Sequence, residues 1–174
     1  MAKITIFGLA GAGKTTVGKL LAKELNYEFV SSGNLFRERA KSMGMTLYEL
    51  EALCNKNPNF DREFDKDVEK YGRTHQNFVL ESRLGWYFVP DSFKIKLTCD
   101  LNERVKRVAR RDKESFEEAL KKTQFREISH EERYFKTYGI TNFGHDSIFD
   151  VIVDSTHVGA SGTVSKMKQA FEKR

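Results

Sequence analysis

The sequence contains little that would suggest a disulfide-linked or metal-clamped protein. Cysteine occurs only twice, at Cys54 and Cys99, without a CxxC motif. This usage predicts neither a disulfide framework nor a zinc site, and it fits two buried thiols in a reducing cytoplasm. The four histidines show no metal-ligand spacing.

Long apolar runs are also absent. No segment approaches the roughly 18 apolar residues that a membrane-spanning helix requires. The chain starts with a strand-like KITIF rather than a basic stretch and an apolar helix, so no secretory signal is expected. There is no internal repeat, low-complexity segment or linker. We therefore expect one cytoplasmic domain over residues 1–174, without a membrane partner.

The charge is biased towards the positive sign. Thirty lysines and arginines stand against 25 acidic residues, a formal net charge of +5. Two explanations compete: general attraction to nucleic acid, or an arginine-lined site for small phosphorylated substrates. Composition does not separate them, but the placement of the arginines can.

Short apolar segments alternate with helical patterns. Strands are expected at 3–8, 27–31, 77–81, 93–99 and 147–155. Helices are expected at 14–26, 33–44, 46–56, 57–72, 100–111, 113–138 and 162–174, with an Asp100/Glu103 capping box opening the fifth. This order predicts an α/β fold: a five-stranded parallel sheet, order 2-3-1-4-5, with helices on both faces. Polar helical insertions are expected at about 34–72 and 112–145.

Residues 8–15, GLAGAGKT, follow the first expected strand and precede the first helix. They match the GxxxxGK[ST] phosphate-binding loop, or P-loop, in the structural context that this motif requires. Glycines let the backbone approach phosphate oxygens, Lys14 reaches the β and γ phosphates, and Thr15 offers its hydroxyl to magnesium. The predicted phosphate-binding set is Gly8, Leu9, Ala10, Gly11, Ala12, Gly13, Lys14, Thr15 and Thr16.

Polar side chains also follow the second and third strands. Ser32 and Arg37 come after one, and Glu81 and Arg83 after the other. Ligands bind at the carboxyl ends of strands in open parallel sheets, so both arginines are expected near the P-loop. A guanidinium suits phosphate because it donates two parallel hydrogen bonds.

Several short stretches carry a resemblance to a known family. SSGNLFR (31–37), LESRLGW (80–86), SFEEA (115–119) and YGI (138–140) occur in the order in which nucleoside monophosphate kinases carry similar motifs. Over Lys3 to about Asp154 the chain most closely resembles the short archaeal-type cytidylate kinases. The resemblance implies a P-loop kinase with an acceptor-binding insertion and an arginine-bearing lid, using ATP and Mg²⁺.

The resemblance also implies roles for individual residues. Arg37 and Arg83 would hold the acceptor's phosphate, with Ser32 and Asn34 also on the acceptor side, and Glu81 would position magnesium through water. Two positions depart from the family pattern. Asn34 stands where aspartate is usual, and Ser82 where glycine is usual, which can alter the choice of acceptor.

The helix expected at 100–111 is rich in arginine. Arg104, Arg107 and Arg111 fall within about 60° of one another beside its apolar stripe, so all three are expected to point into a cleft. Lys106 and Arg110 are assigned to the outer face. By resemblance, Arg107 packs near the adenine and Arg111 reaches the transferring phosphate.

Arg126 and Arg133 are separated by two helical turns on one face. By resemblance they match two arginines of a lid that closes over the phosphates. The alternative is pairing with neighbouring glutamates, namely Glu127, Glu131 and Glu132. A charged segment with few large aliphatic residues is also typical of a mobile lid.

The base-reading residues are the least defined. Asp61 and Asp65, one helical turn apart, could meet an amino group or could instead pair with Arg62 or Lys66.

The favoured function is transfer of phosphate from ATP to CMP or dCMP by a monomeric enzyme without a nucleic-acid partner. The alternatives are another acceptor, AMP or UMP, or a non-catalytic, RNA-associated protein that uses ATP as a switch.

Overall fold

A computed structural model describes residues 2–174, except for the side chains of Pro58, Asn59 and Asp61. Its centre is a parallel sheet with the strand order β2-β3-β1-β4-β5. The strands are β1 (Lys3–Phe7), β2 (Glu28–Ser31), β3 (Phe78–Glu81), β4 (Phe93–Thr98) and β5 (Val151–Asp154). The predicted fold class and strand order are confirmed.

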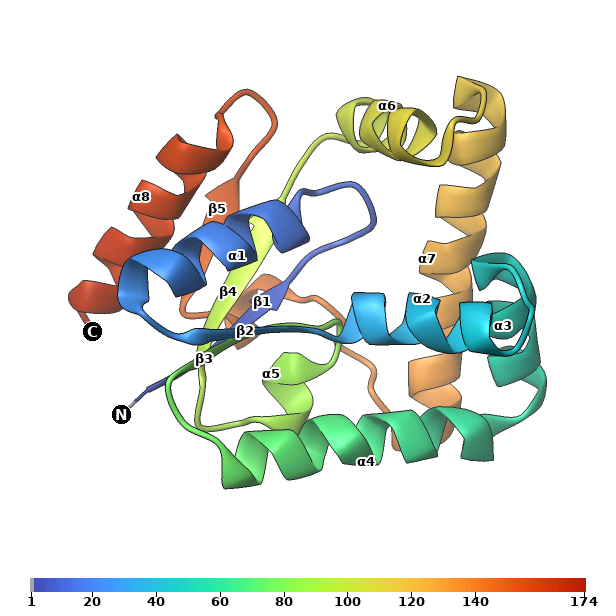
Figure 1. The fold of residues 1–174 in the computed structure, drawn as a ribbon, viewed down its shortest axis with the longest axis horizontal. Coiled ribbons are helices and arrows are strands. Elements are labelled where there is room, and N and C mark those ends of the chain that lie inside the picture. Colours follow the sequence, from blue (N-terminus) through green and yellow to red (C-terminus); the bar gives the residue numbers. More distant parts are fainter. Residues whose placement is uncertain (1) are drawn as a thin grey trace.

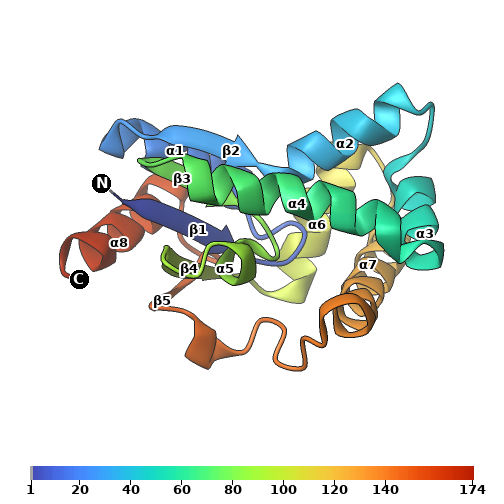
Figure 2. The same ribbon diagram turned by 90° about the horizontal axis from the view of Figure 1, so that it is seen from below.

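Helices cover both faces of the sheet. On one face α1 (Lys14–Leu25) and α8 (Ala160–Glu172) pack against each other and bury Leu21 and Met167 over Ile4 and Ile95 (Figure 1). On the other face lie α4 (Pro58–Thr74) and the short α5 (Gly85–Phe88), which the sequence patterns did not predict. Seen from below, α4 runs from α3 towards β3 (Figure 2).

Two helical regions extend beyond the carboxyl ends of the strands. The first, which we call the acceptor insertion, consists of α2 (Ser32–Ser42), α3 (Leu47–Lys56) and α4, and has its own small core around Leu50 and Cys54. The second consists of α6 (Leu101–Asp112) and α7 (Phe116–Tyr138), the lid helix. The lid helix packs against α6 near its start and against α3 further along (Figure 1).

Three local expectations are wrong. The fifth strand is shorter than 147–155, because β5 is an edge strand that pairs only with Ile95–Thr98, and a 3₁₀ turn precedes it. The expected capping box is not formed: Asp100 makes no side-chain capping bond, and Glu103 pairs with Arg107. Cys54 is buried as expected, but Cys99 is only half-buried.

Within residues 2–174, every helix is too short or too polar to cross a bilayer.

Candidate active site

The loop between β1 and α1 is held tightly against α6. Gly11 has a φ of +81°, and a Cβ at this position would lie 2.3 Å from the carbonyl oxygen of Arg104. Gly13, with a φ of +93°, is the N-cap of α1. Glycine is needed here because other residues rarely adopt this conformation and because there is no room for a side chain at Gly11. The loop therefore presents backbone amides and a helix N-terminus, as anion binding requires.

Lys14 lies inside this loop. Its Nζ donates to the carbonyl oxygen of Leu9 at 2.9 Å. Burial lowers the pKa of Lys14 to about 7, the charges of Arg83, Arg126 and Arg37 act in the same direction, and Glu81 opposes them. A phosphate bound next to this amine would therefore favour its protonated, positively charged form.

Glu81, at the end of β3, accepts hydrogen bonds from several hydroxyl groups next to the loop. Thr15 Oγ1 donates to Glu81 Oε2 at 2.8 Å, and Ser31 Oγ donates to the same oxygen at 2.7 Å. Ser32 Oγ donates to the Glu81 carbonyl oxygen at 3.0 Å. Two segments of the chain, the start of α1 and the end of β2, thus converge on Glu81.

A cavity of about 470 Å³ opens in front of these groups, between the P-loop, the acceptor insertion, α6 and the lid helix. Most of the predicted site residues line it: Ala10, Gly11, Gly13, Lys14, Thr15, Thr16, Ser32, Arg37, Asp65, Glu81, Arg83, Arg107, Arg111, Arg126 and Arg133. Gly8, Leu9, Ala12 and Asn34 do not line it. Ala12 is buried in the core below the loop, and the Leu9 carbonyl serves Lys14.

On the acceptor side the structure brings Arg37 and Arg83 to the same cavity. Arg37 Nη2 donates to Asn34 Oδ1 at 2.6 Å, so Asn34 orients this arginine from outside the cavity wall. Arg83 Nη1 donates to His130 Nε2 at 2.8 Å. Burial lowers the pKa of Arg83 to about 10, and the charge of Arg126 adds to this effect. Burial also lowers the pKa of Arg37.

Arginines of α6 divide between two tasks, and one of them, Arg104, lies elsewhere than its helical angle suggested. Arg104 does not enter the cavity: its guanidinium is buried against the Ala10 carbonyl and Glu127, where it fastens the loop to α6 and α7. Arg110 is exposed, as an outer-face position implies, and it also borders the cavity. Helical angles place a side chain relative to its own helix, but not relative to the elements that pack around it.

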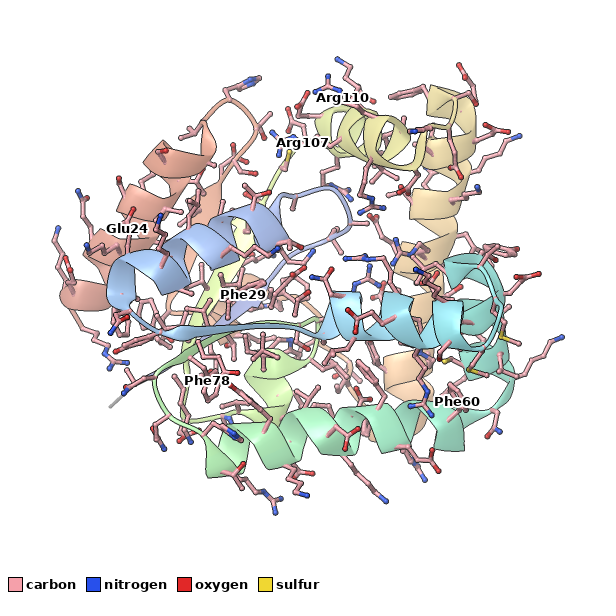
Figure 3. All side chains as sticks on the ribbon, viewed as in Figure 1. Glu24, Phe29, Phe60, Phe78, Arg107 and Arg110 are labelled. Carbon is pink, nitrogen blue, oxygen red and sulfur yellow. The ribbon has the colours of Figure 1, made fainter. Side chains whose placement is uncertain are left out.

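The other two α6 arginines lie where they were expected. Arg107 donates to the Ser155 carbonyl oxygen at 3.0 Å, close to the loop glycine Gly13 (Figure 3). Arg111 donates from Nε and Nη2 to both carboxylate oxygens of Asp112, at 2.7 and 2.8 Å. These bonds raise the pKa of Arg111 and lower that of Asp112.

The lid arginines reach beyond the neighbouring glutamates to the acceptor insertion. Arg126 Nε donates to Glu51 of the acceptor insertion at 2.7 and 3.0 Å, and Arg133 Nη1 donates to Asn55 Oδ1 at 3.3 Å. Glu127 pairs with Arg104 instead. Both arginines therefore connect the lid helix to the acceptor insertion while facing the cavity.

Asp65 lines the cavity and accepts a hydrogen bond from Tyr138 Oη at 2.6 Å. The side chain of Asp61 lies outside the described part of the chain. Near Asp65, Phe36 and Phe64 form an edge-to-face pair on the cavity wall, with ring centroids 5.7 Å apart. They give this end of the cavity an apolar surface.

The cavity carries an excess of positive charge. Three carboxylates, those of Glu51, Asp65 and Glu81, face a larger set of cationic side chains: Lys14, Arg37, Arg83, Arg107, Arg110, Arg111, Arg126 and Arg133. Such an arrangement suits a ligand with several phosphate charges.

Sequence reasoning missed Glu51, His130 and the apolar wall. Glu51 is one residue from buried Leu50 and three from buried Cys54, so it adjoins the buried stripe of its helix. His130 lies on the same helical face as Arg126 and Arg133. The sequence shows these spacings. It does not show the partners of Glu51 and His130, because those partners come from distant segments of the chain.

The residues next to the P-loop fit a magnesium ion. Mg²⁺ prefers oxygen ligands and keeps waters and substrate phosphates in its coordination shell. The Thr15 hydroxyl and the Glu81 carboxylate supply oxygens 2.8 Å apart at the loop. Within the described residues there is no cluster of three acidic, histidine or cysteine ligands, so the protein would supply only part of the shell.

Several solved structures share this fold. An uncharacterized protein from Eubacterium ventriosum superposes with a TM-score of 0.73 at 18% identity, covering 100% of both chains. Shikimate kinase from Bacteroides thetaiotaomicron gives 0.67 at 16% identity and covers 98% of each chain. A gluconokinase from Sinorhizobium meliloti gives 0.64 at 14% identity, covering 99% of this chain and 92% of its own. The fold is that of the P-loop kinases.

Sequence comparison identifies the family. Residues 3–157 match the model of the cytidylate kinase-like family, to which the chain belongs. A cytidylate kinase from Methanosarcina mazei is 38% identical over 98% of this chain and 96% of its own length. One from Thermococcus kodakarensis is 39% identical over 97% of this chain and 87% of its own. The protein is thus a nucleoside monophosphate kinase by class.

Proposed function

We propose that the protein transfers the γ-phosphoryl group of ATP to CMP or dCMP, giving ADP and CDP or dCDP. The observation that carries this proposal is that one cavity joins the P-loop, with Lys14 and Thr15, to Arg37 and Arg83 on the acceptor side. Phosphate binders on both sides of one space are what a transfer between two nucleotides requires. The names of the archaeal relatives support cytidylate as the acceptor.

On the donor side, the loop amides and Lys14 bind the β and γ phosphates. Thr15 and Glu81 would hold Mg²⁺, with Glu81 acting through water. A bound ion would supply positive charge against the negative charge that develops during transfer. Arg107, beside Gly13 and the end of β5, is placed to pack near the adenine.

On the acceptor side, Arg37 and Arg83 bind the monophosphate. Asn34 orients Arg37 through its 2.6 Å hydrogen bond, and Ser32 lines the same wall. The base lies towards the apolar surface of Phe36 and Phe64, where Asp65 can accept a hydrogen bond from an exocyclic amino group.

Transfer needs alignment and positive charge more than covalent chemistry by the protein. Arg111, Arg126 and Arg133 supply that charge around the transferring group. The acceptor phosphate is already anionic, so no general base is required. The lid helix above the cavity limits access of water, which would otherwise accept the phosphate.

The placement of the arginines supports a small phosphorylated ligand over nucleic acid, because seven arginines line one cavity. A monomer without a nucleic-acid partner is part of the proposal. AMP or UMP as acceptor, and an RNA-associated ATP switch, are the competing outcomes of the test below.

The test is a coupled ADP-release assay with ATP, Mg²⁺ and each common nucleoside monophosphate in turn. We expect turnover with CMP or dCMP and its loss in Arg83→Ala. A different preferred acceptor would retain the mechanism but change the substrate. ATP binding without transfer to any monophosphate, together with salt-sensitive RNA binding, would favour the switch.

A further inference from the structure

Glu51 is a buried carboxylate in the cavity wall that the proposed chemistry does not use. It lies on α3, its residue is 1% exposed, and it lines the cavity. Arg126 Nε donates to both of its oxygens, and its Oε1 lies 3.6 Å from His130 Nε2. Ionised carboxylates are seldom buried unless they are paired, because their desolvation is costly.

His130 extends this contact to the acceptor site. Its Nε2 accepts from Arg83, so this ring nitrogen carries no proton in that hydrogen bond. The result is a line of contacts from Arg126 through Glu51 and His130 to Arg83. Glu51 therefore lies between the arginine assigned to the lid and one assigned to the acceptor phosphate, and it is hydrogen-bonded only to the first of these two arginines.

The same region joins the acceptor insertion to the lid helix. The rings of Tyr48 on α3 and Phe125 on α7 lie 5.0 Å apart, next to the Glu51–Arg126 pair. Glu51 therefore makes a buried ionic contact between α3 and α7.

We propose that Glu51 is a positioning residue, whose carboxylate fixes the Arg126 guanidinium at the transferring phosphate by holding it between α3 and α7. This inference rests on the proposed function for the role of Arg126. Glu51 itself does not touch the substrate in this account. Its effect on the rate passes through Arg126, and a guanidinium displaced by about 1 Å can cost about 100-fold in rate.

The kinetic test is a double-mutant cycle with Glu51→Gln and Arg126→Ala, using the best acceptor from the monophosphate panel. We expect Glu51→Gln to lower kcat by about 10- to 100-fold with little change in KM for ATP. In the Arg126→Ala background, Glu51→Gln should cause no further loss. Glu132→Gln, which removes an exposed carboxylate from α7, serves as the control and should leave kcat unchanged.

A second test of the Glu51–Arg126 contact is spectroscopic and does not depend on turnover. In the wild type, the Arg126 Nε–H NMR resonance should exchange slowly with solvent, and Glu51→Gln should speed its exchange. Circular dichroism checks that the variants fold. Additive losses in the cycle, or an Arg126 resonance unaffected by Glu51→Gln, would overturn the inference. Failure of the wild type to phosphorylate any monophosphate would instead overturn the proposed function, and the NMR arm would still test the contact.

Discussion

The hydroxyl of Thr15 donates to Oε2 of Glu81 at 2.8 Å. This bond joins the first turn of α1 to the end of β3, although the two residues are far apart in the sequence. The same carboxylate oxygen accepts from Ser31, so one buried group organises the oxygens next to the phosphate-binding loop. The parallel sheet creates this relationship, because β3 lies between β1 and β2 and all three strands end at the same edge.

Glu81→Gln tests this arrangement. The amide keeps the size of the side chain but lacks the charge that favours a hard cation. Loss of such a contact typically costs about 10- to 100-fold in metal affinity or activity. We expect a corresponding rise in the Mg²⁺ concentration required for half-maximal ADP formation. Glu24→Gln, on the exposed side of α1 (Figure 3), should leave the Mg²⁺ titration unchanged.

Lys14 should take up a proton when nucleotide binds. Its pKa of about 7 means that at pH 8 the free protein holds the amine largely neutral, and phosphate charges will raise that pKa. Calorimetry of ATP binding at pH 8 should give enthalpies that depend on the ionisation enthalpy of the buffer. Lys14→Met should abolish that dependence, and a wild type without it would contradict the predicted burial of a neutral amine.

The same pKa shift affects stability. The unfolded chain keeps this proton up to about pH 10.5, whereas the folded protein loses it near pH 7. The unfolded state therefore binds more protons between these values, and the contribution of Lys14 to the free energy of unfolding should rise with pH. Denaturant titrations of wild type and Lys14→Met across this range should diverge in that direction.

We expect Asp112 to compete with phosphate for Arg111. Both carboxylate oxygens accept from this arginine in a partly exposed ion pair. Asp112→Asn should free the guanidinium and tighten ATP binding by about two- to fivefold, the range in which exposed ion pairs contribute. ADP binding, measured by the same calorimetry, should change less because Arg111 is assigned to the transferring phosphate. Equal effects on both nucleotides would contradict that assignment.

Gly11→Ala should destabilise the protein. Its φ of +81° disfavours a side chain, and the new Cβ would overlap the Arg104 carbonyl oxygen. Together these effects should lower the free energy of unfolding by at least about 2 kcal/mol, or several degrees in Tm. Gly159→Ala, whose Cβ would meet no atom within 4 Å, should leave Tm nearly unchanged.

Much of this architecture could be predicted from sequence because its signals are local. The apolar run at KITIF, the glycines of the loop and the helix after Lys14 define β1, the P-loop and α1 without reference to distant residues. Strand order also followed, since alternating strands and helices permit few arrangements. Arg37 and Arg83 were expected near the P-loop because each comes within a few residues of a strand's carboxyl end, and both line the cavity.

The errors arise where tertiary contacts determine the position and the partners of a side chain. The positions of Arg104 and Arg110 were inferred from their angles on the helix. In the structure the P-loop packs on Arg104, whereas Arg110 lies beside the cavity. Glu51 was not recognised because its partners, Arg126 and His130, lie on α7, more than 70 residues away. Pairing across such separations depends on how the insertion and the lid helix pack, which the helix patterns alone do not specify.

The most direct test of the central claim follows the phosphoryl group itself. ATP labelled with ³²P at the γ position is incubated with the protein, Mg²⁺ and CMP, and the products are separated by chromatography. The account predicts that the label appears in CDP and that Arg83→Ala largely abolishes this transfer. Label released only as inorganic phosphate, or retained in ATP with every monophosphate supplied, would contradict it.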